Sequence, residues 1–170
     1  MNSFFSNDYV STCISLAGFI LSVINSLYLI AVNSFKIDLI QKSYAFCDTL
    51  DRHPVYFELA IENKSRIQVS ISRMFLLVNN KKYEFQWEKE RIGRTEFKCN
   101  GELIEGYSTY SLTLPQSIPG FGVIGGFFYV VTDSSINESD LKSADVKIEI
   151  HTNRGRKRFK VYLSDLSVHN

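Results

Sequence analysis

Four neighbouring residues carry atoms that can bind a metal ion. Cys47, Asp48, Asp51 and His53 offer sulfur, oxygen and nitrogen ligands close together in the chain. Their spacing matches no established metal-site pattern, and the segment reads as a loop. The three cysteines, at positions 13, 47 and 99, are also too widely spaced for a four-thiolate zinc site or a disulfide scaffold. We therefore predict no metal site.

A glycine-rich string could bind phosphate, and three histidines could act as general bases. Gly120–Gly125 matches the GxGxxG pattern of dinucleotide sites, which needs a strand before it and a helix after it. Here Pro115 and Pro119 precede the string and the strand-like FFYVV follows it, so we interpret the match as accidental. The histidines, at positions 53, 151 and 169, are dispersed, and the sequence indicates no nucleophile beside a base. We predict that the chain is not an enzyme and uses no cofactor or small-molecule substrate.

The densest charged segment is basic. Five cations lie near the C-terminal end: Arg154, Arg156, Lys157, Arg158 and Lys160. Such charges protect a sheet edge from pairing with other chains. The alternative is that they contact the anionic headgroups of a membrane. The whole chain has 19 Lys and Arg against 18 Asp and Glu, a net charge of +1, so we predict no nucleic-acid partner.

A long uncharged segment precedes this cluster. Residues 106–132 carry no charge, and the apolar part, 118–131, is too short to cross a membrane. One interpretation is a glycine-rich loop that leads into a buried strand. The other is a loop at 118–125 that touches the bilayer or a partner. Its tip would be formed by Phe121, Val123 and Ile124.

The first element that would position these residues is an apolar helix. Val10–Val32 is a run of 23 uncharged residues, and no charge occurs between Asp8 and Lys36. At about 1.5 Å per residue this helix is about 34 Å long, enough to cross a hydrocarbon layer of about 30 Å. No Lys or Arg precedes it, so it lacks the positive region of a cleaved signal peptide. We predict an uncleaved transmembrane helix; the alternative is a buried core helix, although a soluble helix normally keeps a charged face.

Basic residues near this helix lie on its C-terminal side. Lys36 and Lys42 follow it and none precedes it, which favours an N-terminus outside the cell and a cytoplasmic domain. Two charges are a small bias, so the reverse orientation stays open. We predict a single-pass protein of the cell membrane. We expect the glycosylation sequons at Asn63 and Asn137 to be silent turns.

Small and polar residues recur along one side of the helix. Their spacings of 4, 3, 4 and 3 place them on a single seam: Ser11, Ser15, Gly18, Ser22 and Asn25. Such a seam lets a second helix approach closely and form hydrogen bonds across the interface. We predict a protein partner or a homo-oligomer formed through the transmembrane helix. The alternative is that the serines bond their own helix backbone and mark no interface.

After the helix, apolar and polar residues alternate at the period of β-strands. The alternation predicts about eight short strands: 35–39, 55–62, 67–78, 83–87, 108–114, 127–131, 146–150 and 159–163. The last two face each other across a turn at Asn153–Gly155, where glycine supplies a positive φ. We expect no amphipathic helix. We predict an antiparallel, immunoglobulin-like β-sandwich at 33–170, preceded by a tail at 1–9 and the helix at 10–32.

Several segments resemble those of a group of small bacterial membrane proteins. They are the uncharged serine-containing helix, FELAIENKSRIQVSISRMFLLVNNKKYEF, GELIEGYSTYSLTL and the final VKIEIHTNRGRKRFKVYL hairpin. Over almost its whole length the chain is similar to single-pass proteins with an N-terminal transmembrane helix and a C-terminal immunoglobulin-like β-sandwich. These motifs specify strands and turns, and no chemistry. The Cys, Trp, Cys pattern of antibody domains is absent, so we predict no Cys47–Cys99 disulfide.

These patterns lead to two hypotheses about function. The first is a membrane-anchored, non-enzymatic interaction module that binds another membrane protein or itself. The alternative is a lipid-facing module, in which the basic hairpin at 154–160 and the apolar loop at 118–125 contact anionic headgroups. In both hypotheses the domain stays beside the membrane lipid bilayer.

Overall fold

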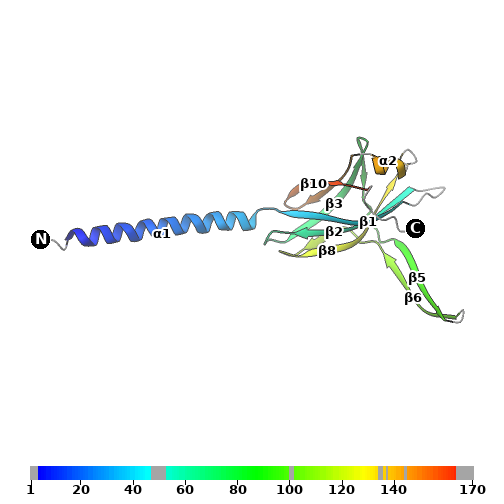
Figure 1. Ribbon diagram of the computed structural model, residues 1–170, viewed down its shortest axis with the longest axis horizontal. Coiled ribbons are helices and arrows are strands. Elements are labelled where there is room, and N and C mark those ends of the chain that lie inside the picture. The colour runs from blue at the N-terminus through cyan, green and yellow to red at the C-terminus, as the bar shows by residue number, and fades with distance from the viewer. Residues whose placement is uncertain are drawn as a thin grey trace. The chain divides into compact units, whose positions relative to one another are not determined.

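The computed structural model describes residues 4–46, 53–99, 102–133, 136, 138–143 and 145–163. The chain divides into two compact units, Met1–Ser34 and Phe35–Asn170. The first unit holds helix α1, and the second is the β domain (Figure 1). The described part of the β domain consists mainly of strands in antiparallel sheets. The predicted mainly β fold behind one N-terminal apolar helix is confirmed.

Helix α1 runs from Phe4 to Asn33, so it begins six residues before the predicted segment. Its stretch Tyr9–Asn33 has a mean hydropathy of 2.0 and is not buried within the chain. This stretch is long and apolar enough to cross a membrane. At the C-terminal end, Ser34 Oγ donates to Ala31 O at 2.7 Å, which satisfies one of the carbonyls that a helix end leaves without a partner.

The β domain contains ten strands and one short helix among the residues that the structure describes. The strands are β1 (Ile37–Phe46), β2 (His53–Asn63), β3 (Val69–Val78), β4 (Lys81–Glu84), β5 (Arg91–Cys99), β6 (Glu102–Tyr110), β7 (Gln116–Ile118), β8 (Val123–Thr132), β9 (Val146–Thr152) and β10 (Gly155–Val161). The short helix α2 (Glu138–Ser143) precedes β9. Within it, Lys142 Nζ lies 2.8 Å from Glu138 Oε1, one helical turn away.

The strands form three sheets. One has the order β1-β2-β8, and the largest has the order β10-β9-β3-β4 with β7 also paired to β3. The third sheet is the β5–β6 hairpin, which extends away from the other two in Figure 1. Both larger sheets contribute to one hydrophobic core, in which Phe57 and Leu59 of β2 are fully buried with Ile148 and Ile150 of β9. Each such side chain stabilises the fold by about 1.5–3 kcal/mol. The immunoglobulin-like class stays a prediction.

Two segments cover the edge of β8 that does not pair with β2. Directly after β4, Phe85 forms a bridge to β8, and Gln86 N donates to Tyr129 O at 2.9 Å. Directly after β6, Leu112 N donates to Phe127 O at 2.6 Å. The chain therefore turns away from the β4 and β6 strands, and the residues that follow them hydrogen-bond to this edge of β8.

Several predicted elements differ from the structure, and the pairing with β8 explains the first two differences. β4 ends at Glu84 and β6 at Tyr110, so the strands predicted over 83–87 and 108–114 have the wrong extent. Strand β5 and helix α2 were not predicted. The apolar residues of 67–78 change from odd to even positions, and the structure explains this by a bulge between Ile71 and Arg73.

Two tight turns join hairpin strands, and the one predicted at Asn153–Gly155 is confirmed. Between β3 and β4, Asn79 and Asn80 have φ of 48° and 64°, as a two-residue type I′ turn requires. Between β9 and β10, Thr152 pairs with Gly155, whose φ is 139°. The final hairpin therefore forms where the sequence predicts it.

Candidate functional site

Two loops meet at the end of the β domain where β1 begins. They follow β2 and β7, and we call residues 64–68 and 119–122 the end loops. Asn63 joins them from a fully buried position. Its Nδ2 donates to Ile67 O at 2.9 Å and to Pro119 O at 3.0 Å, while its Oδ1 accepts from Ser65 N at 3.0 Å. Because this amide is buried and both its nitrogen and its oxygen are hydrogen-bonded, Asn63 cannot accept a glycan in the folded domain.

Phe121 projects from the second end loop into solvent. Its side chain is 68% exposed, although its backbone has a φ of 56°, in the left-handed region that bulky residues avoid. Phe121 N donates to Ser65 O at 3.0 Å, and a Cβ on the preceding Gly120 would lie 1.8 Å from Arg66 O. The close packing of the two loops therefore holds this strained conformation, which costs about 1–3 kcal/mol.

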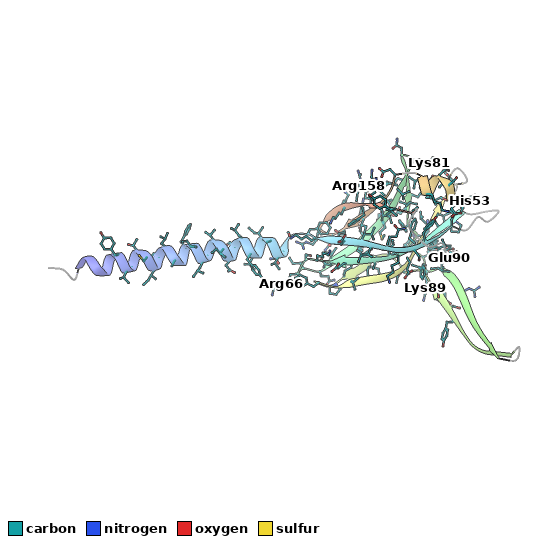
Figure 2. All side chains as sticks on the ribbon, viewed as in Figure 1. His53, Arg66, Lys81, Lys89, Glu90 and Arg158 are labelled. Carbon is teal, nitrogen blue, oxygen red and sulfur yellow. The ribbon has the colours of Figure 1, made fainter. Side chains whose placement is uncertain are left out.

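The residues around Phe121 are apolar and basic. Ile67 is 42% exposed and Val123 is 61% exposed. Arg66 is exposed at the end of the domain where β1 begins (Figure 2), and no ion pair engages it in the part of the chain that the structure describes. Lys64 Nζ lies 2.7 Å from Asp38 Oδ2. This end of the domain thus carries exposed apolar side chains beside cations.

The predicted basic cluster is divided by the pleat of β10. Arg156, Arg158 and Lys160 alternate along the face that points away from the core. Arg158 Nε donates to Glu149 Oε2 at 2.5 Å, and Lys160 Nζ lies 3.2 Å from Asp145 Oδ1. Two of these three cations are therefore engaged within the domain.

The other two cations of the cluster lie elsewhere. Lys157 Nζ donates to Ile37 O at 2.5 Å, and so links the last strand of one sheet to the first strand of the other. Both strands are sheet edges. Arg154 is half-buried in the turn before β10, where its backbone N donates to Thr152 Oγ1 at 3.1 Å. The five cations do not share one surface, and the contact made by Lys157 agrees with edge protection.

Glu149 is a buried carboxylate on the outer face of β9. It is 2% exposed, although its neighbours Ile148 and Ile150 point into the core on the opposite face. Lys82 Nζ lies 2.7 Å from Oε1 and His151 Nε2 lies 2.6 Å from it. Hydrogen bonds with Lys82, with His151 and with the arginine on β10 lower the pKa of this carboxyl to about 2.

The β5–β6 hairpin has no third strand. Within the described residues, these two strands pair only with each other. At the base of the hairpin, Ser111 N donates to Glu90 O at 2.8 Å, and Lys89 Nζ lies 4.4 Å from the centre of the Tyr110 ring. Tyr107 is 51% exposed. A two-stranded ribbon of this kind is only marginally stable alone in water.

Three of these features were not predicted from the sequence: the β5–β6 hairpin, the buried Asn63 and the buried Glu149. The hairpin had a signal, because Asn100 and Gly101 lie between β5 and β6 and Asn-Gly favours a two-residue hairpin turn. Asn63 and Glu149 gave no local signal, since their partners are distant in the chain.

The seam residues of α1 are exposed within the chain. Ser15 Oγ donates to Ser11 O at 2.9 Å, so this hydroxyl bonds its own helix backbone. A Cβ on Gly18 would have nothing within 4 Å, which leaves room for a second helix to approach. Interhelical contact along Ser11, Ser15, Gly18, Ser22 and Asn25 stays a prediction.

Of the four candidate metal ligands, the structure describes only His53. Cys47, Asp48 and Asp51 lie outside the described residues. His53 begins β2, where its carbonyl accepts from Thr132 Oγ1 at 3.0 Å. The described residues contain no group of three His, Cys, Asp or Glu that could hold a metal ion. The GxGxxG string leads into β8 and not into a helix.

No protein-family model matches the chain, and neither does the sequence of any curated protein.

Proposed function

We propose that this chain is a single-pass membrane protein whose β domain is a non-enzymatic binding module. In this proposal α1 is the anchor, with the N-terminus outside the cell and the β domain in the cytoplasm. The stretch Tyr9–Asn33 supports the anchor because it is strongly apolar, carries no charge on any side and is not buried within the chain. Lys36 and Lys42 support the orientation.

The observation that carries the binding role is the β5–β6 hairpin. Its two strands have nine residues each, and neither finds a further strand within the described residues. Each outer edge therefore offers backbone N–H and C=O groups that an extended segment of a partner can pair with. The partner is another membrane protein or a second copy of this chain.

The base of the hairpin allows a clean test. Because Ser111 N already donates to Glu90 O, the pair has the hydrogen bond of a four-residue β-turn. Residues 91–110 can therefore be replaced by Asn-Gly without moving the flanking chain. The full chain is expressed in membranes with a photo-crosslinking amino acid at Tyr107, and the matched control carries it at Tyr162, which is also more than half exposed.

We expect protein adducts from position 107 and none from position 162. A second pair of proteins carries the photo-crosslinker at Trp87, close to the base of the hairpin: one is the intact chain and the other has the Asn-Gly replacement. The intact chain should give protein adducts from position 87, and the replacement variant should not. Equal adducts from 107 and 162, or adducts that persist after the replacement, would show that the hairpin is not the binding element.

The helix seam supports a second contact of the same module. Asn25 is the strongest hydrogen-bonding side chain of the seam, and an amide in the membrane is costly without a partner. Asn25→Leu should reduce crosslinked complexes formed through α1. The control is Leu27→Ala, because Leu27 lies on the opposite side of the helix from the seam. An equal effect of both substitutions would count against the seam.

A further inference from the structure

We propose that the end loops form a membrane-contacting tip, in which Phe121, Ile67 and Val123 enter the headgroup region and Arg66 contacts anionic headgroups. The tip would touch the leaflet at which α1 ends. This inference rests on the proposed function, because it requires α1 to span the membrane.

The reach of the chain supports this contact. Lys64 N donates to Lys36 O at 2.8 Å, and Asn63 N donates to Gly122 O at 2.9 Å, so the three segments lie side by side. The backbone of the second end loop is therefore two strand spacings, about 10 Å, from Lys36. Lys36 follows Asn33 by three residues, at most about 11 Å of chain. A short covalent path therefore links the tip to the end of α1.

The hydrogen bonding of the tip suits an apolar surface. Phe121 N is bonded to Ser65 O, and Gly122 N donates to Pro119 O at 3.0 Å. Backbone groups that are already paired enter a low-polarity environment at little cost, whereas open loops cannot. The backbone that carries the exposed ring is also held in place by the packing of Gly120 against Arg66, so little backbone freedom is lost on contact.

The charges beside the apolar side chains favour an anionic lipid surface as the partner. Lys36 and Arg66 are exposed, and neither takes part in an ion pair with another described residue. Lys64 is paired, because its Nζ lies 2.7 Å from Asp38 Oδ2 and 3.6 Å from Glu62 Oε2. Exposed aromatic and aliphatic side chains next to free cations are the combination with which amphipathic surfaces bind anionic bilayers.

The test places a fluorescent reporter at the tip of the full chain. The single Trp87 is replaced by Phe, and Phe121→Trp is then reconstituted into nanodiscs that contain phosphatidylglycerol and a lipid with a nitroxide near the headgroup. The matched control is Tyr162→Trp, which is 61% exposed and directly follows the opposite end of β10 from Gly155. We expect at least about threefold stronger quenching at 121 than at 162.

A third reporter separates this inference from the anchor. Leu21→Trp lies within α1 and should be quenched by a nitroxide at the middle of the acyl chain if α1 spans the bilayer. Quenching at 21 with equal, weak quenching at 121 and 162 would overturn the tip and leave the anchor in place. No quenching at 21 would overturn both.

A charge reversal tests the headgroup contact. Arg66→Glu in the Phe121→Trp background should weaken quenching in discs with phosphatidylglycerol and leave it unchanged in discs of phosphatidylcholine alone. An equal effect in both lipids, or none in either, would overturn the role of Arg66. Circular dichroism of the variant then shows whether the β domain is still folded.

Discussion

Arg158 and Glu149 lie directly opposite each other in the β10–β9 pair, and Arg158 Nε donates to Glu149 Oε2 at 2.5 Å. Glu149 is 2% exposed on a face that points away from the core. Long basic side chains from β4 and β10 therefore cover this carboxylate, and their apolar stems contribute to the cover. Lys82 Nζ, for example, also lies 3.9 Å from the centre of the Phe75 ring. The charge of Glu149 thus links β4, β9 and β10 on the outer face of the large sheet.

Replacing Glu149 by Gln should destabilise the domain. The change removes the charge that holds Lys82 and Arg158, and leaves these cations close to each other. We expect a loss of about 2 kcal/mol in the free energy of unfolding. Urea unfolding of the full chain in detergent, followed by near-ultraviolet circular dichroism, measures it. Glu84→Gln is the control, because its exposed 3.5 Å pair with Arg73 contributes less than about 0.5 kcal/mol.

Acid should weaken the domain through the same carboxylate. The folded-state pKa of Glu149 is about 2, below the ordinary value of 4.5, so the unfolded chain takes up this proton more readily. The stabilisation is complete above about pH 4.5 and is lost as the pH falls towards 2. Allowing for the exposed partners, we expect the wild type to lose about 2 kcal/mol more than Glu149→Gln between pH 6 and pH 2. Parallel stability curves for the two proteins would contradict this.

Replacing Asn63 by Ala should release the end loops. The buried amide bonds both loops, and its loss leaves several buried backbone groups without partners, for a cost of about 3 kcal/mol. Hydrogen exchange at the amide of Phe121 should accelerate more than exchange in β9. Uniform acceleration across the domain would show that Asn63 stabilises the whole fold and not the loops specifically.

Gly120 should not tolerate a side chain. Its added Cβ would lie 1.8 Å from Arg66 O, which is backbone and cannot move without displacing the other end loop. We expect Gly120→Ala to cost more than about 2 kcal/mol. Gly125→Ala is the matched control, because its Cβ would meet its nearest atom at 3.7 Å, an ordinary contact. Thermal unfolding of both variants measures the difference, and equal melting temperatures would refute the close approach.

Phe121→Asn should raise the stability of the folded β domain. Asn tolerates the left-handed conformation better than Phe, so the free energy of unfolding should rise by about 0.5–1 kcal/mol. If the variant is instead less stable than the wild type, Phe121 stabilises the domain and the prediction is wrong. The measurement is urea unfolding, paired with sedimentation of the reconstituted chain on vesicles as a check of its assembly.

The sequence predicts elements that depend on local patterns. The uncharged run that forms α1 and the hairpin around Gly155 are both encoded within a few neighbouring residues, and both are present. Strand β5 was not predicted, although the Asn100-Gly101 pair after it is a dipeptide that favours a hairpin turn. The extents of β4 and β6 could not be predicted locally, because the residues that follow each strand hydrogen-bond to β8, which is distant in the chain.

The candidate sites depend on distant partners and could not be predicted in this way. Asn63 lies in a polar Asn-Lys-Ser-Arg turn that reads as solvated, yet Pro119, far along the chain, covers its amide. Glu149 occupies a position in β9 that the strand period assigns to solvent, yet Lys82 and Arg158 bury it. In both cases the period of the strand gives the direction of the side chain, and only the assembled sheets give its partners.

The strand order also determines when each large sheet can form during synthesis of the chain. β2 pairs with β8, and β3 pairs with β9, so each sheet needs strands from the second half of the chain. Helix α1 is complete before any strand has been translated. A nascent chain would therefore present a finished apolar segment to the insertion machinery while β2 and β3 still lack their partners. Cotranslational delivery to the membrane would then precede folding of the domain, and neither of these two sheets could close before β8 and β9 had been translated.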